Sequence, residues 1–182
     1  MPTLTEMKSA VEDKVVDMMA KFEEEVGSAC KYPVKLPRDI NFTVKGKTAG
    51  KAYFDYAVGE GHLDFNPVIM EDNWERFIER TVPHEVAHYC VSLYVGYLTS
   101  RNGRRICHGK DWKGMMRYFG ISDSTRCHSY DTSRVKTRVQ RKWEYKCDCS
   151  THMVSTNLHN KMQRGQTRHC ADCKTNVKWV GV

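Results

Sequence analysis

The sequence predicts an α+β protein with a separate ribbon at its C-terminal end. Apolar residues recur at helical spacing in the first 26 residues and again between residues 72 and 120. Short alternating segments between residues 40 and 65 indicate a small sheet. Two close cysteine pairs mark the last quarter of the chain. We therefore expect a main core over residues 1–132 and a ribbon over residues 133–182.

Composition places the chain among folded, water-soluble proteins. Its 182 residues are 40% hydrophobic, and no apolar run approaches the roughly 20 residues that a membrane span needs. The N-terminal residues lack the pattern of a secretory signal, so we expect a cytoplasmic protein, associated with the nucleoid or nucleus if it binds DNA. Thiols in a reducing compartment serve as metal ligands or core residues. Four scattered cysteines are expected to be core thiols: Cys30, Cys90, Cys107 and Cys127.

Positive charge is concentrated in the ribbon. Residues 133–182 hold eleven Lys and Arg, Arg138 among them, against three acidic residues, a balance of +8 in a chain whose net charge is +7. The rest of the chain is therefore near neutral. A basic segment of this kind is a candidate binding surface for a polyanion.

The first element is predicted to be an amphipathic helix. Thr3 and Glu6 form a capping-box signature, and Gly27 is a plausible end. The apolar face between them consists of Val11, Val15, Met18, Met19, Phe22 and Val26.

The alternating segments predict about three strands. Residues 40–44 and 52–56 are expected to pair as a hairpin across the turn that Gly46 and Gly50 mark. A further strand around residues 63–65 ends at Asn66-Pro67.

Helical spacing resumes at Asp72. Pro83 lacks an N–H group, so we expect a kink or a new helix there, continuing to Leu93 or Leu98. Another helix begins near Asp111 and ends at Gly120.

An H-E-x-x-H motif occupies the second of these helices, at residues 84–88. Residues four apart share one helix face, so His84 and His88 can reach the same zinc ion while Glu85 faces the open coordination position. Zinc lowers the pKa of its bound water and polarises a carbonyl, and Glu85 can accept the proton of that water as a general base. The motif predicts metal-assisted hydrolysis.

A catalytic zinc takes three protein ligands, so a third donor is required. Val91 and Tyr94 stand where the extended H-E-x-x-H-x-x-G-x-x-H motif needs Gly and His, so that motif is absent. His108 is the best remaining candidate. It lies 20 residues after His88 and directly before the helix predicted from Asp111.

These motifs together resemble bacterial SprT proteins and, more distantly, the protease domain of Spartan. In the core, the likeness runs from Trp74 through the motif to His108-Gly109-x-x-Trp112 and Arg126-Cys127-His128. In the ribbon, it includes Tyr145-x-Cys147-x-Cys149-x-x-His152, His159-Asn160, Gly165 and Cys170-x-x-Cys173. It covers about residues 40 to 180. It implies a zincin-like, minigluzincin-type core in which His108 is the third zinc ligand. It also implies peptide-bond hydrolysis of DNA-associated or DNA-crosslinked proteins, with single-stranded or distorted DNA as activator.

Three further side chains are candidates for a place near the first site. His62 and His128 are not expected to be ligands, because a lone His in a loop is more often structural. Tyr130 could donate to an oxyanion, but a packing role is favoured.

The cysteine pairs predict a second, structural zinc site. Cys147, Cys149, Cys170 and Cys173 supply the four soft ligands of a tetrahedral ion. The C-x-C pair is tighter than the common C-x-x-C pair, so His152 or His159 could replace one thiolate.

Aromatic residues are interleaved with the basic residues of the ribbon, a mixture that suits unpaired bases of single-stranded DNA. The same rings could instead form the ribbon's own core. The predicted nucleic-acid contacts are Arg141, Lys142, Trp143, Lys161, Arg164 and Arg168.

The sequence thus favours a zinc-dependent endopeptidase with one catalytic and one structural zinc, a protein substrate and DNA as partner. The main alternative is a nucleic-acid-binding adaptor whose zincin core is only a scaffold, although the presence of Glu85 beside both histidines argues against it. A third possibility is a transcription or replication accessory module in which the ribbon is the functional part.

Overall fold

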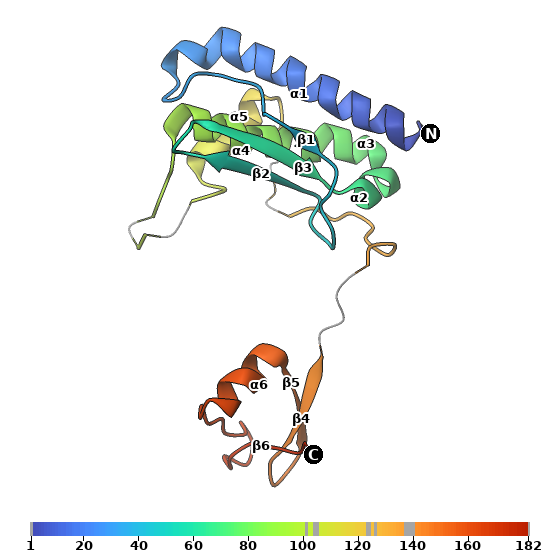
Figure 1. The fold of residues 1–182 in the computed structure, drawn as a ribbon, viewed down its shortest axis with the longest axis vertical. Helices are drawn as coiled ribbons and strands as arrows, with labels where there is room; N and C mark the ends of the chain where they lie inside the picture. The colour runs from blue at the N-terminus through green and yellow to red at the C-terminus, as the bar shows by residue number, and fades with distance from the viewer. Residues whose placement is uncertain are drawn as a thin grey trace. The chain divides into compact units, whose positions relative to one another are not determined.

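The computed structural model describes residues 2–100, 102–103, 106–122, 125, 127–136 and 141–181 (Figure 1). The chain is a mixed α+β structure that divides into two compact units, Met1–Thr137 and Arg138–Val182. Arg126 and Arg138, which entered the sequence patterns, lie outside the described residues. The domain boundary expected between residues 132 and 133 stays a prediction.

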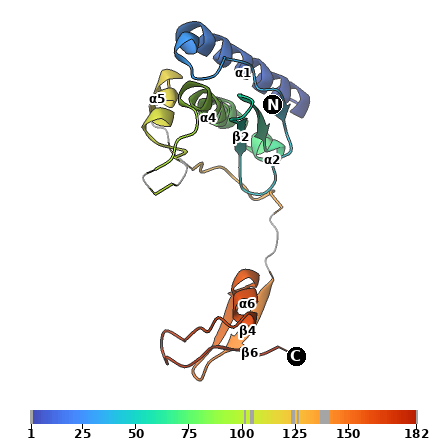
Figure 2. The same ribbon diagram turned by 60° about the vertical axis from the view of Figure 1, so that its left-hand side comes forward.

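Helix α4 (Val82–Val95) is the central element of the first unit. It packs against α1 (Leu4–Val26), α5 (Lys110–Tyr118) and β2 (Gly50–Asp55), and Figures 1 and 2 show these elements around it. Most α4 side chains are buried, as expected for a helix with neighbours on several sides. The H-E-x-x-H motif therefore lies on the most enclosed helix of the unit.

The predicted first helix is confirmed as α1. The Thr3 hydroxyl accepts a hydrogen bond from the Glu6 N–H (3.3 Å), and the Glu6 carboxylate accepts one from the Thr3 N–H (2.7 Å). Gly27 caps the helix and begins a short 3-10 turn, Gly27–Ala29. The side chains buried along α1 are Met7, Val11, Val15, Met19 and Phe22. The predicted helix near Asp111 is likewise confirmed as α5, with Gly120 at its end in a left-handed conformation (φ +83°).

The sheet of the first unit has the strand order β1-β3-β2. Strand β3 (Glu60–Phe65) pairs antiparallel with all of β2, from Gly50 opposite Phe65 to Asp55 opposite Glu60. It pairs in parallel with β1 (Ile40–Asn41). The predicted hairpin between residues 40–44 and 52–56 is therefore wrong, because the hairpin joins β2 to β3.

Strand β3 lies between β1 and β2, so the loop before β2 closes no hairpin, and Asn66 binds that loop. Its side-chain amide donates to the carbonyl oxygens of Gly46 (2.8 Å) and Thr48 (3.0 Å), which takes up acceptors of that loop. The β2–β3 hairpin turns instead at Gly59, whose φ of +72° suits glycine.

Asn66 also starts the helical region. Its side chain accepts hydrogen bonds from the N–H groups of Val68 and Ile69, and α2 (Pro67–Asp72) follows with proline in its first turn. The sequence prediction began this region at Asp72 and missed α2. Helix α3 (Trp74–Arg76) comes next.

The disturbance predicted at Pro83 takes the form of a π-helical segment, η2 (Phe77–Thr81), that leads into α4. The N–H of Val82 bonds to the carbonyl oxygen of Phe77, five residues earlier. This wider turn compensates for the N–H group that Pro83 lacks, so the chain remains helical up to the motif.

The second unit is a small sheet with one helix. Its strands are β4 (Lys142–Lys146), β5 (Thr151–Ser155) and β6 (Lys178–Trp179), in the antiparallel order β5-β4-β6. Helix α6 (Thr156–Gln163), which was not predicted, follows β5 and is capped by the Ser155 hydroxyl. No helix in the described part of the chain is long and apolar enough to cross a membrane.

Candidate metal centres

Three imidazoles meet beside α4. His84 and His88 lie one turn apart on α4, and His108 lies just before α5. The Nε2 atoms of His84 and His88 are 3.2 Å apart, and each is 3.1 Å from the Nε2 atom of His108. The structure thus brings together the three residues predicted to hold one ion.

This triangle of nitrogens suits a cation. A tetrahedral zinc ion with Zn–N bonds of about 2.0–2.1 Å holds its ligand nitrogens about 3.3–3.4 Å apart, close to the spacing found here. Each Nε2 either carries a proton or offers a lone pair, so at least two of the three are alike and face each other without a hydrogen bond. A cation between them removes that repulsion. Burial, followed by the neighbouring His108 and His128, lowers the pKa of His84 to about 4, which keeps its ring in the neutral form that a ligand requires.

Trp112 packs against all three imidazoles. Its ring centre lies 4.7 Å from those of His84 and His108 and 5.5 Å from that of His88, and its Nε1–H donates to the backbone carbonyl of His84 (3.4 Å). The side chain is 1% exposed. Trp112 therefore fixes the orientation of the imidazoles, a role that the sequence signalled only through its place four residues after His108.

Glu85 lies between α4 and β2. The residue is 6% exposed, and its carboxyl group accepts a hydrogen bond from the backbone N–H of Ala52. Burial raises the pKa of Glu85 to about 8, against the effect of that hydrogen bond. A cation held by the histidines would lower this pKa and favour the carboxylate.

The histidines and Glu85 line one cleft of about 770 Å³. Residues 50–54 of β2 line it as well, and β2 is an edge strand of its sheet. The cleft therefore combines a candidate metal centre, a buried carboxyl group and an exposed strand edge.

His128 and Tyr130 line the same cleft but have structural bonds. The Nε2–H of His128 donates to the Lys47 carbonyl (3.0 Å), and its Nδ1 accepts from the Tyr130 N–H (3.4 Å). The Tyr130 hydroxyl donates to the Arg76 carbonyl (3.0 Å) and lies 2.9 Å from the Thr81 hydroxyl. These contacts agree with a structural role for His128 and a packing role for Tyr130. His62 stacks on Tyr53 and does not line the cleft.

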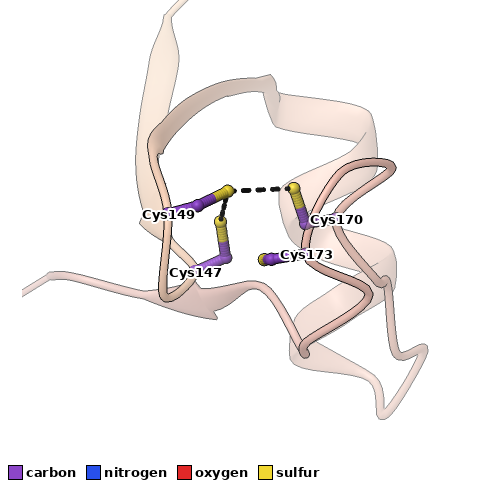
Figure 3. Close-up of side chains that lie close together, drawn as sticks. All are labelled: Cys147, Cys149, Cys170 and Cys173. Carbon is purple, nitrogen blue, oxygen red and sulfur yellow. Dashed lines mark hydrogen bonds between the residues drawn. The ribbon is translucent and has the colours of Figure 1, made fainter.

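Four sulfur atoms meet in the second unit, those of Cys147, Cys149, Cys170 and Cys173 (Figure 3). The Cys149 sulfur lies 3.5 Å from that of Cys147 and 3.7 Å from that of Cys170. Tetrahedral zinc with bonds of about 2.3 Å places its sulfurs about 3.8 Å apart. The cluster is therefore a second candidate metal site compatible with zinc.

Neither histidine that could have replaced a thiolate belongs to this group. His152 Nε2 lies 3.1 Å from the Cys147 sulfur and 3.2 Å from the Ser150 hydroxyl, where it can donate to one of them. His159 is buried, stacks on Trp143 at 3.7 Å and shares a hydrogen bond with the Tyr145 hydroxyl.

The expectation of core thiols holds for part of the scattered cysteines. Cys90 is buried and Cys30 is half-buried, whereas Cys107 and Cys127 are exposed. Cys107 and Cys127 are not core thiols, because both lie in loops that line the cleft.

The residues predicted to contact nucleic acid all lie in the second unit, and the five charged ones are exposed. Trp143 is more enclosed. The Arg141 guanidinium lies 3.9 Å from its ring centre and the His159 ring 3.7 Å, and groups this close must occupy opposite faces. Trp179, at 41% exposed, offers the more open ring.

Comparison with known proteins gives a consistent result. The sequence profile of the SprT-like family matches residues 16–139. A protein SprT of Vibrio parahaemolyticus is 37% identical over 145 residues, which cover 79% of this chain and 79% of that protein. A protein SprT of Shewanella oneidensis is 34% identical, with coverage of 75% and 79%, and one of Proteus mirabilis is 31% identical, with coverage of 91% and 93%. No solved structure matches the chain.

Proposed function

Because this chain belongs to the SprT-like family, we propose that it is a zinc-dependent endopeptidase with a zincin-like core, acting on DNA-associated or DNA-crosslinked proteins. The observation that carries the proposal is the meeting of three Nε2 nitrogens in the same cleft as a buried carboxyl group. In this assignment His84, His88 and His108 hold the catalytic zinc.

A zinc ion at this position would supply a water of lowered pKa and would polarise the scissile carbonyl. Glu85 takes the proton from the attacking water and delivers it to the departing amine. The Ala52 N–H favours the carboxylate form of Glu85, which is the form that accepts a proton. Trp112 keeps the three imidazoles aligned.

The cleft is suited to an extended polypeptide. Strand β2 lies at the edge of its sheet and lines the cleft, so a substrate can pair with its backbone as an added strand. Pairing of this kind reads the backbone and tolerates many side chains, as a protease acting on varied proteins requires.

In the second unit, the four cysteines would hold a structural zinc that stabilises a segment with few buried side chains. Single-stranded DNA would bind the exposed cations around it, and DNA bound there would bring the peptidase to proteins on DNA.

Glu85→Gln tests the activity. The amide cannot accept the proton of water, so the variant should keep zinc at both sites and lose hydrolysis of casein. Zinc per chain and casein cleavage are measured on both proteins. Wild-type turnover in the variant would exclude Glu85 as the base. A wild-type protein that binds zinc and DNA but cleaves nothing would favour the adaptor.

A further inference from the structure

The cleft above the histidines has basic walls. Lys47 and Lys51 line it beside Gly50, and Arg76 of α3 and Arg80 of η2 line it one turn apart, before α4. Among the described residues of the lining, the one acidic side chain is Glu85, which is buried. The charge on the open surface of this cleft is therefore of one sign.

Three of these cations form no ion pair with a described residue. Lys47 and Lys51 are within 4 Å of no described carboxylate. Lys51 lies opposite Asp64 of β3, whose carboxylate accepts hydrogen bonds from the Thr43 N–H and hydroxyl. Arg76 donates to a neutral group, the Ser129 hydroxyl (3.2 Å), and its guanidinium lies over the Tyr130 ring. A concave surface lined by like charges concentrates its field and attracts ligands of the opposite sign.

Lys51 lies on the strand with which an extended substrate would pair. Side chains directly opposite each other on paired strands have Cβ atoms about 4.5–5.5 Å apart, and opposite charges at such positions are favourable. A carboxylate in the added strand can therefore approach Lys51 from across the pair. Because the lysines accompany a strand edge in a cleft of about 770 Å³, a polypeptide suits this surface better than a DNA duplex.

We propose that this cleft selects polypeptide segments that carry Asp or Glu beside the cleaved bond. The inference rests on the proposed peptidase function, since it concerns the substrates of that same site. It adds a charge preference that the metal centre does not itself require.

Matched peptides test the proposal. Two fluorogenic peptides differ only in flanking residues, Asp and Glu in one and Asn and Gln in the other. The acidic peptide should have a kcat/KM higher by roughly threefold for each favourable pair, since exposed ion pairs contribute up to about a factor of five. The advantage should shrink between 50 and 500 mM salt. Binding of both peptides to the Glu85→Gln protein, followed by fluorescence anisotropy, should show the same preference without turnover.

Charge reversal identifies the residues responsible. Lys47→Glu/Lys51→Glu should abolish or invert the preference, whereas Lys14→Glu, a charge-matched change on α1 outside the cleft lining, should preserve it. Equal kinetics for the two peptides, or a preference that survives the double reversal, overturns the proposal. So does a single-stranded oligonucleotide that blocks the cleft while the peptides show no charge preference, because the cations then bind nucleic acid. If casein and both peptides stay intact, the peptidase function itself fails.

Discussion

Gly50 leaves the space that the Glu85 side chain occupies. A methyl group at Gly50 would lie 2.7 Å from Glu85 Cγ and 3.0 Å from Oε1, distances too short for real contacts. Glu85 is buried between α4 and β2, so its side chain has little room to move aside. The position of the proposed base therefore depends on a residue in a different element.

Gly50→Ala should displace Glu85 and reduce hydrolysis without removing zinc. A catalytic group misplaced by about 1 Å can cost on the order of 100-fold in rate, so we expect a loss of kcat of tenfold or more. Casein cleavage and zinc content measure the two effects separately.

Gly114→Ala is the matched control, because a methyl group there meets nothing within 4 Å and the residue lies inside α5. It should leave kcat unchanged and stabilise the helix by about 0.5–1 kcal/mol. A Gly50→Ala enzyme with normal kcat would show that Glu85 can shift freely.

Local elements could be predicted well from the sequence, whereas contacts between distant segments could not. Helical spacing and capping residues predicted α1 and α5 because these signals lie within one segment. Alternation identified the strands but not their partners, since it does not record that β3 pairs with both β1 and β2. The spacing of His84 and His88 and the place of His108 suggested one cluster. The fit of Glu85 against Gly50 depends on packing between elements, which no local pattern records.

His108→Ala should remove the zinc of the first site and leave the other. Two imidazoles form a weak site, and the four cysteines lie in a separate unit. Zinc per chain should fall from two ions to one, with loss of casein cleavage. His128→Ala is the control, because both its ring nitrogens are engaged with backbone groups. Retention of two tightly bound ions in His108→Ala would require a different third ligand.

Cys170→Ser should remove the other zinc and unfold the second unit. Cys170 is 3% exposed and its sulfur lies 3.7 Å from that of Cys149. Structural zinc supplies about 10 kcal/mol or more of folding free energy in small domains, and few side chains in this unit are buried. Limited proteolysis should then cleave within residues 141–181 while the first unit persists. Cys107→Ser, which is exposed and belongs to the first unit, should leave the second unit as resistant to proteolysis as in the wild type. Full protection of Cys170→Ser would mean that the unit folds without metal.

Single-stranded DNA should bind the second unit with strong salt dependence. Each cation that neutralises a phosphate releases condensed counterions and contributes about 0.7 to the slope of log K against log salt. Arg164 and Arg168 are exposed after α6, so Arg164→Ala/Arg168→Ala should weaken binding and reduce that slope by about 1.4. Fluorescence anisotropy of a labelled oligonucleotide between 50 and 200 mM salt measures both quantities. Lys8→Ala/Lys14→Ala removes the same charge from α1 in the first unit and should leave the slope unchanged. Equal slopes for the arginine variant and wild type would place the phosphates elsewhere and leave the four-cysteine unit with a structural role alone.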